Sequence, residues 1–352
     1  MSVSVFEHTG LSGLFGDPET QLLFSADAQL EHMLTFERAL INALEAIKRI
    51  DAPTAAAARI AFEAFEPDWD RLREGVARDG VIVPSLVQQL RGTLSAPDAI
   101  HAGATSQDVI DTATAMTLRE VARLFDTRLT KVLERLEALL GRYGERQIMG
   151  RTRMQAALPI SAAHRIESWM SPLTDAKSRC AAVTSEVAVL SLGGPVGDGE
   201  SFGRAQSDLA AQMSVELALS VPDPATHTDR GRLVRFGDWL SHLSGGLGKL
   251  GQDIALMAQQ GIDEIVLDAG GRSSAMAHKR NPVLAELLVT LARFNAAQVA
   301  ALHGTLVFEQ ERSGSAWALE WMVLPQMATA TGRGLTVALD LLDQIAEIAP
   351  RA

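Results

Sequence analysis

Cysteine and tyrosine are almost absent from the sequence, which has one residue of each among 352. A single thiol, Cys180, forms no disulfide within the chain, and the N-terminal stretch MSVSVFEHTG lacks the basic and apolar regions of a secretory signal. These two absences predict a cytoplasmic protein. Cys180 lies within a segment of helical periodicity, so we expect a small buried side chain and not a nucleophile.

Basic charge is also scarce, since 32 Lys and Arg residues face 43 Asp and Glu residues and the formal net charge is -11. Nucleic-acid binding needs a basic surface that displaces counterions, so this balance argues against an extended nucleic-acid interface. Any anionic ligand must therefore be held by local cations. No uninterrupted apolar run reaches the roughly 18 residues that cross a bilayer, so we expect no membrane span.

Motifs for metals and cofactors are missing too. The eight histidines are scattered, with no His-x-x-x-His pattern, no Cys/His pairing and no calcium-binding loop. Neither a phosphate loop nor a dinucleotide-binding glycine pattern follows a strand. The sequence thus predicts chemistry that uses neither a metal nor a cofactor.

Helical periodicity, by contrast, fills most of the chain. In the segment 112–146 the apolar residues recur at steps of three and four, at Leu118, Val121, Phe125, Leu129, Val132, Leu136 and Leu139. Further long helices are expected at about 162–192, 229–260 and 283–312, and alternating strand patterns are almost absent. Helices of about 30 residues need lateral packing in a bundle, so the expected fold class is all-α.

Two other features predict how this bundle is organised. The first hundred residues contain shorter helices separated by prolines, so we expect a small N-terminal helical domain at 1–111 and a bundle domain at 112–352. The glycines of LSGGLGKLG (243–251) favour close helix packing, and TGRGLTVALDLLDQIAEIA (331–349) is expected to be helical. Sequence alone does not separate burial within the chain from burial between subunits.

The first of three polar stretches at helix ends is HAGATSQDVIDTA (101–113), which leads into the first long helix. Thr105, Ser106 and Asp108 have the side chains of an N-terminal cap, and capping alone explains them. A helix N-terminus with free N–H groups also binds carboxylates, so the same residues can cap the helix and bind a ligand.

The second polar stretch is GRTRMQAALPIS (150–161), which is expected to be a loop between two long helices. Arg151 and Arg153 have the ordinary explanation of surface charges. Gln155 is flanked by apolar residues, and an amide that turns inward needs polar partners that a ligand can supply.

The third polar stretch is GGRSSAMAHKRNP (270–282), which precedes another long helix. Its glycines give flexibility, Ser273 and Ser274 present hydroxyls, and Lys279 and Asn281 come just before the proline at the helix start. As a bare pattern, a surface loop followed by a helix cap explains this composition.

Taken together and in this order, the three stretches resemble the fumarase/aspartase superfamily, whose G-S-S-x-M-P-x-K-x-N-P loop the third stretch matches in part. LFGD (14–17), FSADAQLEHMLTFERAL (24–40) and ERSGSAWALEW (311–321) extend the resemblance to the 3-carboxy-cis,cis-muconate cycloisomerase branch. It spans nearly the whole chain, although many relatives have a longer C-terminal domain. The resemblance implies a homotetramer with a central helical bundle, whose active sites each draw on three subunits.

The reaction implied by this resemblance closes a muconate to a lactone. One substrate carboxylate adds across a C=C bond, and a proton is delivered to the carbon beside another carboxylate, through a dianionic aci-carboxylate. By resemblance Ser273 transfers the proton, and Lys279 with Asn281 stabilises the developing charge. The resemblance also implies that Thr105, Ser106 and Gln155 bind substrate carboxylates and that His101 lines or orients the site, although a simple structural role for His101 is the alternative. We also expect Arg153 and Ser274 to bind the substrate. The implied partner is a small anionic substrate, and no cofactor is required.

Three positions depart from the pattern of the relatives. Arg153 stands where the lyases have an acid/base histidine and many muconate cycloisomerases have a large apolar residue. Arg272 replaces a glycine and Ala277 a proline in the third stretch. An extra guanidinium suits a highly anionic substrate, such as a muconate with a sulfonate in place of the 3-carboxylate, but neutral drift explains the loop changes equally well. An adenylosuccinate-lyase-like elimination and a non-catalytic structural homologue are further alternatives.

Overall fold

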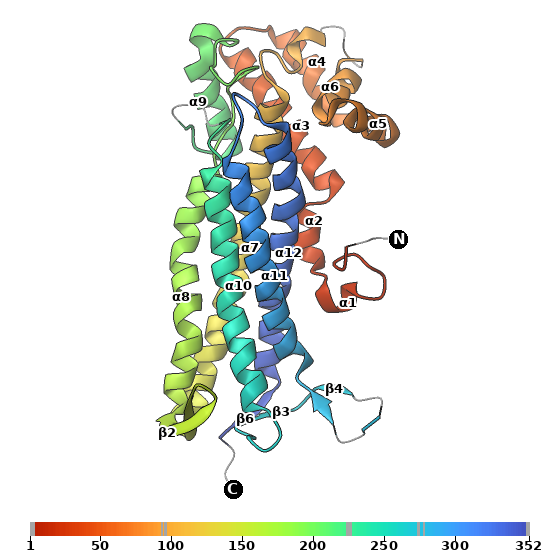
Figure 1. Cartoon of the computed structure of the whole chain (residues 1–352). Helices are drawn as coiled ribbons and strands as arrows, with labels where there is room; N and C mark the ends of the chain where they lie inside the picture. Colours follow the sequence, from red (N-terminus) through yellow and green to blue (C-terminus); the bar gives the residue numbers. More distant parts are fainter. Residues whose placement is uncertain are drawn as a thin grey trace.

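The computed structural model of the protein describes residues 4–92, 94, 97–222, 227–272, 275–276 and 279–349, without the side chain of Arg272. Five long helices run side by side as a bundle, and shorter helices gather at one end of it (Figure 1). The long helices are α7 (Ser106–Tyr143), α8 (Ala162–Val187), α10 (Gly231–Met257), α11 (Val283–His303) and α12 (Gly314–Asp343). The expectation of a mainly helical long-bundle fold is confirmed.

The ends of the long helices differ from the expected ends by several residues. α7 begins at Ser106 and not at 112, because Thr105 and Asp108 cap it. The helix expected at 162–192 ends at Val187, after which Val189 forms an isolated bridge with Ser220. The helix expected to reach 312 ends at His303 and is followed by the short helix η3 (Gly304–Leu306).

Three short antiparallel strand pairs were not expected from the sequence. The second polar stretch is part of a hairpin, β1 (Gln147–Thr152) with β2 (Gln155–Ser161), and not an open loop. The predicted helix at 331–349 also ends early, because β6 (Ile345–Ile348) pairs with β3 (Ile265–Leu267) and buries its two end isoleucines. The third pair, β4 (Gly271–Arg272) with β5 (Arg280–Asn281), closes the third polar stretch.

The shorter helices begin where prolines and capping side chains permit. Pro18, Pro53 and Pro84 each occupy the first turn of a helix, where no N–H partner is lost. These elements are α1 (Ser12–Phe15), α2 (Pro18–Leu23), α3 (Ala26–Ala46), α4 (Ala52–Glu63), α5 (Trp69–Asp79), α6 (Val83–Arg91) and η1 (Pro97–Ala99). α3 to α6 lie at one end of the bundle with α9 (Gln206–Leu217), which follows η2 (Gly203–Ala205) in the middle of the chain, whereas α1 and α2 lie beside the bundle (Figure 1).

Buried apolar side chains form two clusters. One fills the bundle, and the other lies among α3 to α6, α9 and the first turns of α7. α7 contributes to both, with Met116 in the end cluster and Leu118 in the bundle cluster. The domain boundary expected between residues 111 and 112 falls inside this continuous helix, and it stays a prediction.

Close packing of α10 is confirmed at its glycines. A Cβ atom on Gly248 would lie 2.5 Å from the Cβ of Ala292, and one on Gly251 would lie 2.5 Å from the carbonyl oxygen of Ala285. Glycine at these positions therefore lets α10 and α11 approach closely. Cys180 is buried in the bundle as expected, and burial raises the pKa of its thiol.

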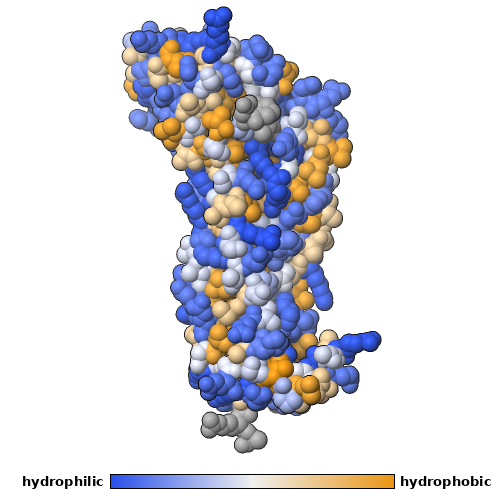
Figure 2. All heavy atoms as spheres, turned by 90° about the vertical axis from the view of Figure 1, so that its left-hand side faces the viewer, coloured by the Kyte–Doolittle hydropathy of each residue, from blue (hydrophilic) through white to orange (hydrophobic). Residues whose placement is uncertain are grey.

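The surface of the bundle is not uniform. Hydrophilic side chains cover most of the face on the α8 side, with apolar residues scattered among them (Figure 2). α11 with η3 has the length and composition of a membrane span, and only 28% of its most apolar window is buried within the chain. α11 packs along α10 and α12, and a single helix of this length and composition is weak evidence for a membrane.

Candidate active site

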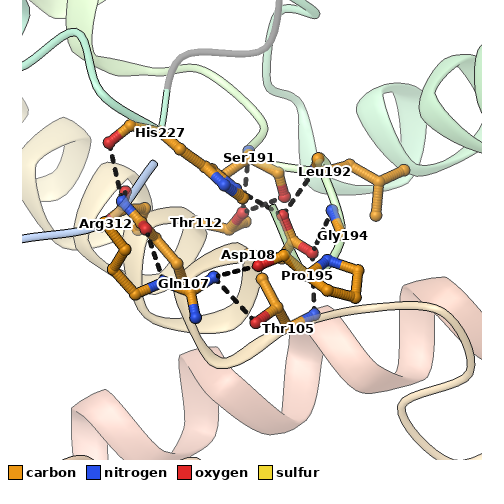
Figure 3. Close-up of polar contacts among 12 residues, drawn as sticks. Thr105, Gln107, Asp108, Thr112, Ser191, Leu192, Gly194, Pro195, His227 and Arg312 are labelled. Carbon is orange, nitrogen blue, oxygen red and sulfur yellow. Dashed lines mark hydrogen bonds and ion pairs between the residues drawn. The ribbon is translucent and has the colours of Figure 1, made fainter. Parts of the chain in front are cut away.

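The N-terminus of α7 is built around one buried carboxylate. Asp108 is fully buried, and its Oδ2 accepts hydrogen bonds from the N–H of Thr105 at 2.9 Å and of Gly194 at 3.0 Å. Its Oδ1 accepts the N–H of Gly193 at 2.6 Å and lies 2.8 Å from Nε2 of His227 (Figure 3). The predicted cap is therefore confirmed, and the same carboxylate also anchors the glycine segment 193–194 to α7.

A guanidinium lies beside this helix N-terminus. Arg312 donates to the hydroxyl oxygen of Thr105 through Nη2 and to the amide oxygen of Gln107 through Nε, both at 3.0 Å (Figure 3). It also donates to the carbonyl oxygen of Pro195 at 3.1 Å. Ser106, the first residue of α7, is half-buried next to these groups. A positive helix end, two hydroxyls and a guanidinium together make a site suited to a carboxylate.

A second charged cluster supports the first turns of α7. Arg230 is buried, and it donates to Asp111 at 2.6 Å and to Glu320 at 2.5 Å. Burial alone would lower the pKa of Arg230, but the two carboxylates raise it above its ordinary value. Burial raises the pKa of Glu320. At Asp111 the charge of Arg230 outweighs burial, so the pKa of Asp111 lies below its ordinary value. Because Trp317 also donates to Asp111 at 3.0 Å, this cluster fastens α7 to α10 and α12.

His101 precedes α7 in a strained conformation. Its φ angle is 60°, which residues other than glycine rarely adopt. Its backbone N–H donates to Oε2 of Glu37 at 3.0 Å, and its Nδ1 lies 2.6 Å from Oε1 of the same carboxylate. The structure thus places His101, Thr105 and Ser106 together at one end of the bundle.

The second polar stretch lies at the other end. Arg153 and Met154 form the turn of the β1–β2 hairpin, with φ angles of 50° and 65°, and Gln155 is the exposed first residue of β2. Arg151 is bound to Glu264 at 2.7 Å, so it has a structural partner. Gln155 does not turn into the interior of its own chain, and Arg153 points a cation outward from a strained turn.

The third polar stretch is described only in part. Lys279 is exposed, and Asn281 is half-buried in β5 opposite Gly271 of β4. Ser273 and Ser274 lie outside the described residues, as does Ala277. The next helix begins directly after the proline of this stretch, as expected.

One chain does not bring the three stretches together. α7 has 38 residues and is therefore about 57 Å long at the helical rise of about 1.5 Å per residue. It separates Thr105 from the β1–β2 hairpin, and β4 lies at the hairpin end as well (Figure 1). His101 and Ser106 are thus near Thr105, but Arg153, Gln155, Lys279 and Asn281 are not.

A cavity of about 430 Å³ lies near the first turns of α7, on the side of α3, α5 and α12. Its lining is mostly apolar and includes Met33, Trp69 and Trp321, and it contains none of the predicted site residues. We therefore place the candidate site at the N-terminus of α7. Within the described ranges, no three His, Cys, Asp or Glu side chains are grouped so as to hold a metal ion.

Four residues of this end were not singled out from the sequence, namely Glu37, Gln107, His227 and Arg312. Glu37 and Arg312 belong to segments that carry the family resemblance. A charged residue within the apolar pattern of a helix was the available signal for Glu37, since carboxylates are rarely buried without a partner. Nothing in the local sequence connects Arg312 with Thr105, 207 residues away.

Comparisons with known proteins identify the family of the chain. A family model described as lyase matches residues 21–299. The 3-carboxy-cis,cis-muconate cycloisomerase of Pseudomonas aeruginosa is 33% identical over 329 residues, which cover 91% of this chain and 72% of the relative.

Solved structures of a fumarate lyase and of a muconate lactonizing enzyme are also similar to this chain. A fumarate lyase from Mesorhizobium sp. BNC1 superposes with a TM-score of 0.88 at 28% identity, covering 94% of this chain and 76% of that one. A 3-carboxy-cis,cis-muconate lactonizing enzyme from Pseudomonas putida also gives 0.88, at 29% identity, covering 96% and 76%. The chain therefore belongs to the lyase family of the fumarase/aspartase superfamily.

Proposed function

We propose that the protein is a cycloisomerase that converts 3-carboxy-cis,cis-muconate to a carboxymuconolactone, in the β-ketoadipate pathway of aromatic degradation in the cytoplasm. The observation that carries the proposal is the N-terminus of α7, where Thr105, Ser106 and Arg312 surround a positive helix end. Such a site suits a substrate with several carboxylates. The likeness to named muconate cycloisomerases over most of the chain supports the same reaction.

The active unit in this proposal is a homotetramer whose sites draw on three subunits. Three observations support association. The polar stretches of one chain lie at opposite ends of the bundle, and α11 is apolar with little burial inside its own chain. The β1–β2 hairpin also exposes Met154 and Leu158, at 73% and 74% of their full area.

In the proposed mechanism the substrate supplies its own nucleophile. Thr105, Ser106, His101, Gln155, Arg153 and Ser274 bind the carboxylates. One carboxylate oxygen then adds across the C=C bond, and Lys279 with Asn281 stabilises the aci-carboxylate. Ser273 delivers a proton to the carbon beside this group and regains one from solvent, so the lactone forms with the net uptake of one proton.

The test is turnover of 3-carboxy-cis,cis-muconate, followed by the loss of its ultraviolet absorbance. The wild-type protein is expected to consume the substrate, and Ser273→Ala to lose at least about 100-fold in kcat. Absence of turnover, together with an unchanged Ser273→Ala variant, would favour a non-catalytic structural homologue. Turnover of adenylosuccinate instead would favour the elimination reaction.

A second candidate substrate is 3-sulfomuconate. The observation in its favour is Arg153, an exposed guanidinium in a turn where both residues have positive φ. Backbone strain is often retained where it positions a functional side chain. Comparing kcat/KM for the two muconates decides between them, and equal or exclusive use of the carboxylate would rule out the sulfonate specialisation.

A further inference from the structure

Glu37 is a buried carboxylate that the proposed mechanism does not use. It lies on α3 with 1% of its side chain exposed. Both of its oxygens meet one residue, since Oε2 accepts the backbone N–H of His101 and Oε1 lies 2.6 Å from its Nδ1. A buried ionised carboxylate is costly unless it is paired and hydrogen-bonded. His101 supplies both kinds of partner.

This contact determines which ring nitrogen of His101 carries a proton. An ionised carboxylate only accepts hydrogen bonds, so the group between Oε1 and Nδ1 must be an Nδ1–H. Nε2 is then the ring atom that remains for another partner. No residue in the described ranges forms a hydrogen bond with Nε2, and the His101 side chain is 14% exposed.

The surrounding chain holds His101 in place. Ile100 is fully buried, and its carbonyl oxygen accepts a hydrogen bond from Arg91 at 2.9 Å. Gly103 packs against Phe202 so closely that a Cβ atom would lie 2.9 Å from the ring. The strained φ of His101 is therefore fixed from both sides, four residues before the cap of α7.

The other charged side chains around His101 contact groups other than its ring or face solvent. Arg91 donates to the carbonyl of Ile100 and Arg49 to the carbonyl of Phe202. Asp98 of η1 is exposed, and Asp108 of α7 accepts the four donors described above. On the remaining neighbours of α3, Arg59 of α4 pairs with Glu45, Glu216 of α9 accepts from Asn42, and Glu120 of α7 pairs with His32.

We propose that Glu37 is a positioning residue, which fixes the proton on Nδ1 of His101 and presents Nε2 to a carboxylate of the substrate. With a proton on both ring nitrogens, Nδ1–H donates to Glu37 and Nε2–H donates to that carboxylate, so the ring bridges the two carboxylates. Glu37 then balances the imidazolium charge from the opposite side. The identity of the bound anion rests on the proposed function, whereas the state of the free His101 ring does not.

The first test uses the protein without substrate. Nitrogen-15 NMR of histidine-labelled protein, with the His101 signals assigned from His101→Gln, is expected to show a protonated Nδ1. Glu37→Gln keeps the size of the side chain but offers one acceptor oxygen in place of two, so the fixed tautomer should be lost. An unprotonated Nδ1 in the wild type, or an unchanged ring in Glu37→Gln, would overturn the proposal.

The second test is kinetic, with 3-carboxy-cis,cis-muconate. Glu37→Gln is expected to raise KM about tenfold or more while kcat changes less than about threefold. Glu31→Gln is the matched control, because Glu31 lies on the same helix but is exposed and paired with Arg38. This control should leave both constants within about twofold of the wild type.

The double variant Glu37→Gln/His101→Gln separates positioning from a general effect on the fold. If Glu37 acts through His101, the double variant should be no worse than His101→Gln alone, whereas additive losses would contradict the proposal. Should Glu37→Gln fail to fold, Glu37→Asp keeps the charge and is expected to give an intermediate KM. If the protein turns over no muconate, the proposed function fails and the NMR result still decides the role of Glu37.

Discussion

The two ends of the bundle hold their polar side chains in different ways. At the α7 N-terminus, Thr105 and Asp108 belong to a buried network that their own chain completes. At the hairpin end, Arg153 and Gln155 are exposed. The difference indicates that the first end is preorganised by its own chain, whereas the second is exposed in the single chain and, by our proposal, meets a neighbouring subunit with substrate.

The largest effect is expected from mixing inactive subunits. Thr105→Ala and Lys279→Ala alter opposite ends, and each should lose about 100-fold or more in kcat/KM. If sites are shared between subunits, unfolding the two variants together and refolding them should restore about a quarter of the wild-type activity, because random assembly leaves that share of sites intact.

The control for this mixture is Lys279→Ala with Ser273→Ala. Both residues come from one stretch of one subunit, so every site would contain one of the two changes. Activity should not return in this mixture. Equal recovery in both mixtures, or none in the first, would contradict shared sites.

The next effect is expected from Asp108→Ala at the preorganised end. This change leaves the buried donors of Thr105, Gly193 and Gly194 without an acceptor, so the free energy of unfolding should fall by about 3 kcal/mol or more. Urea unfolding followed by circular dichroism measures the loss. Asp198→Ala, at an exposed position, should change stability by less than about 0.5 kcal/mol, and a similar loss in both variants would argue against the network.

A smaller effect, a gain and not a loss in the free energy of unfolding, is expected at the hairpin turn. Arg153→Gly removes the strain of a positive φ and should raise the free energy of unfolding by about 1 kcal/mol, while activity falls because the guanidinium is lost. Met154→Gly relieves the same kind of strain and retains Arg153. It should therefore gain stability without the loss of activity, and an equal loss of activity in both variants would show that the loss of the Arg153 guanidinium is not its cause.

The smallest effect is a change in the pH dependence of stability. Burial alone would raise the pKa of Asp111, but Arg230 holds it below its ordinary value, near 3.9 in unfolded chains. A carboxyl whose pKa is lowered on folding stabilises the fold above the unfolded pKa, and this contribution is lost as the pH falls through the folded pKa. Asp111→Asn should therefore lose less stability than the wild type between pH 6 and 3 in urea unfolding. Asp70→Asn, at a side chain 81% exposed, should follow the wild type.

The parts of the fold that could be predicted from the sequence are those encoded locally. The long helices follow from periodic apolar residues, and the cap at Thr105 and Asp108 follows from residues three positions apart. Strand β6 could not be recognised, because its partner β3 lies about eighty residues earlier and the short segment itself fits a helical pattern.

The candidate site shows the same limit. Residue composition at the expected helix ends identified the polar stretches, and the structure places His101, Thr105 and Ser106 at one helix end. The contact between His101 and Glu37 joins residues 64 positions apart, and that between Arg312 and Thr105 spans 207. Such long-range contacts depend on how the helices pack, which no local pattern records.

The continuity of α7 has a consequence for cooperativity. Because this helix supplies side chains to both apolar clusters, neither cluster can lose its packing without exposing apolar surface of a helix that the other also needs. The chain should therefore melt in a single transition although it has two cores. Separating the two halves at residue 111 would cut one of the elements that link their stabilities, besides α12, which also contributes to both clusters.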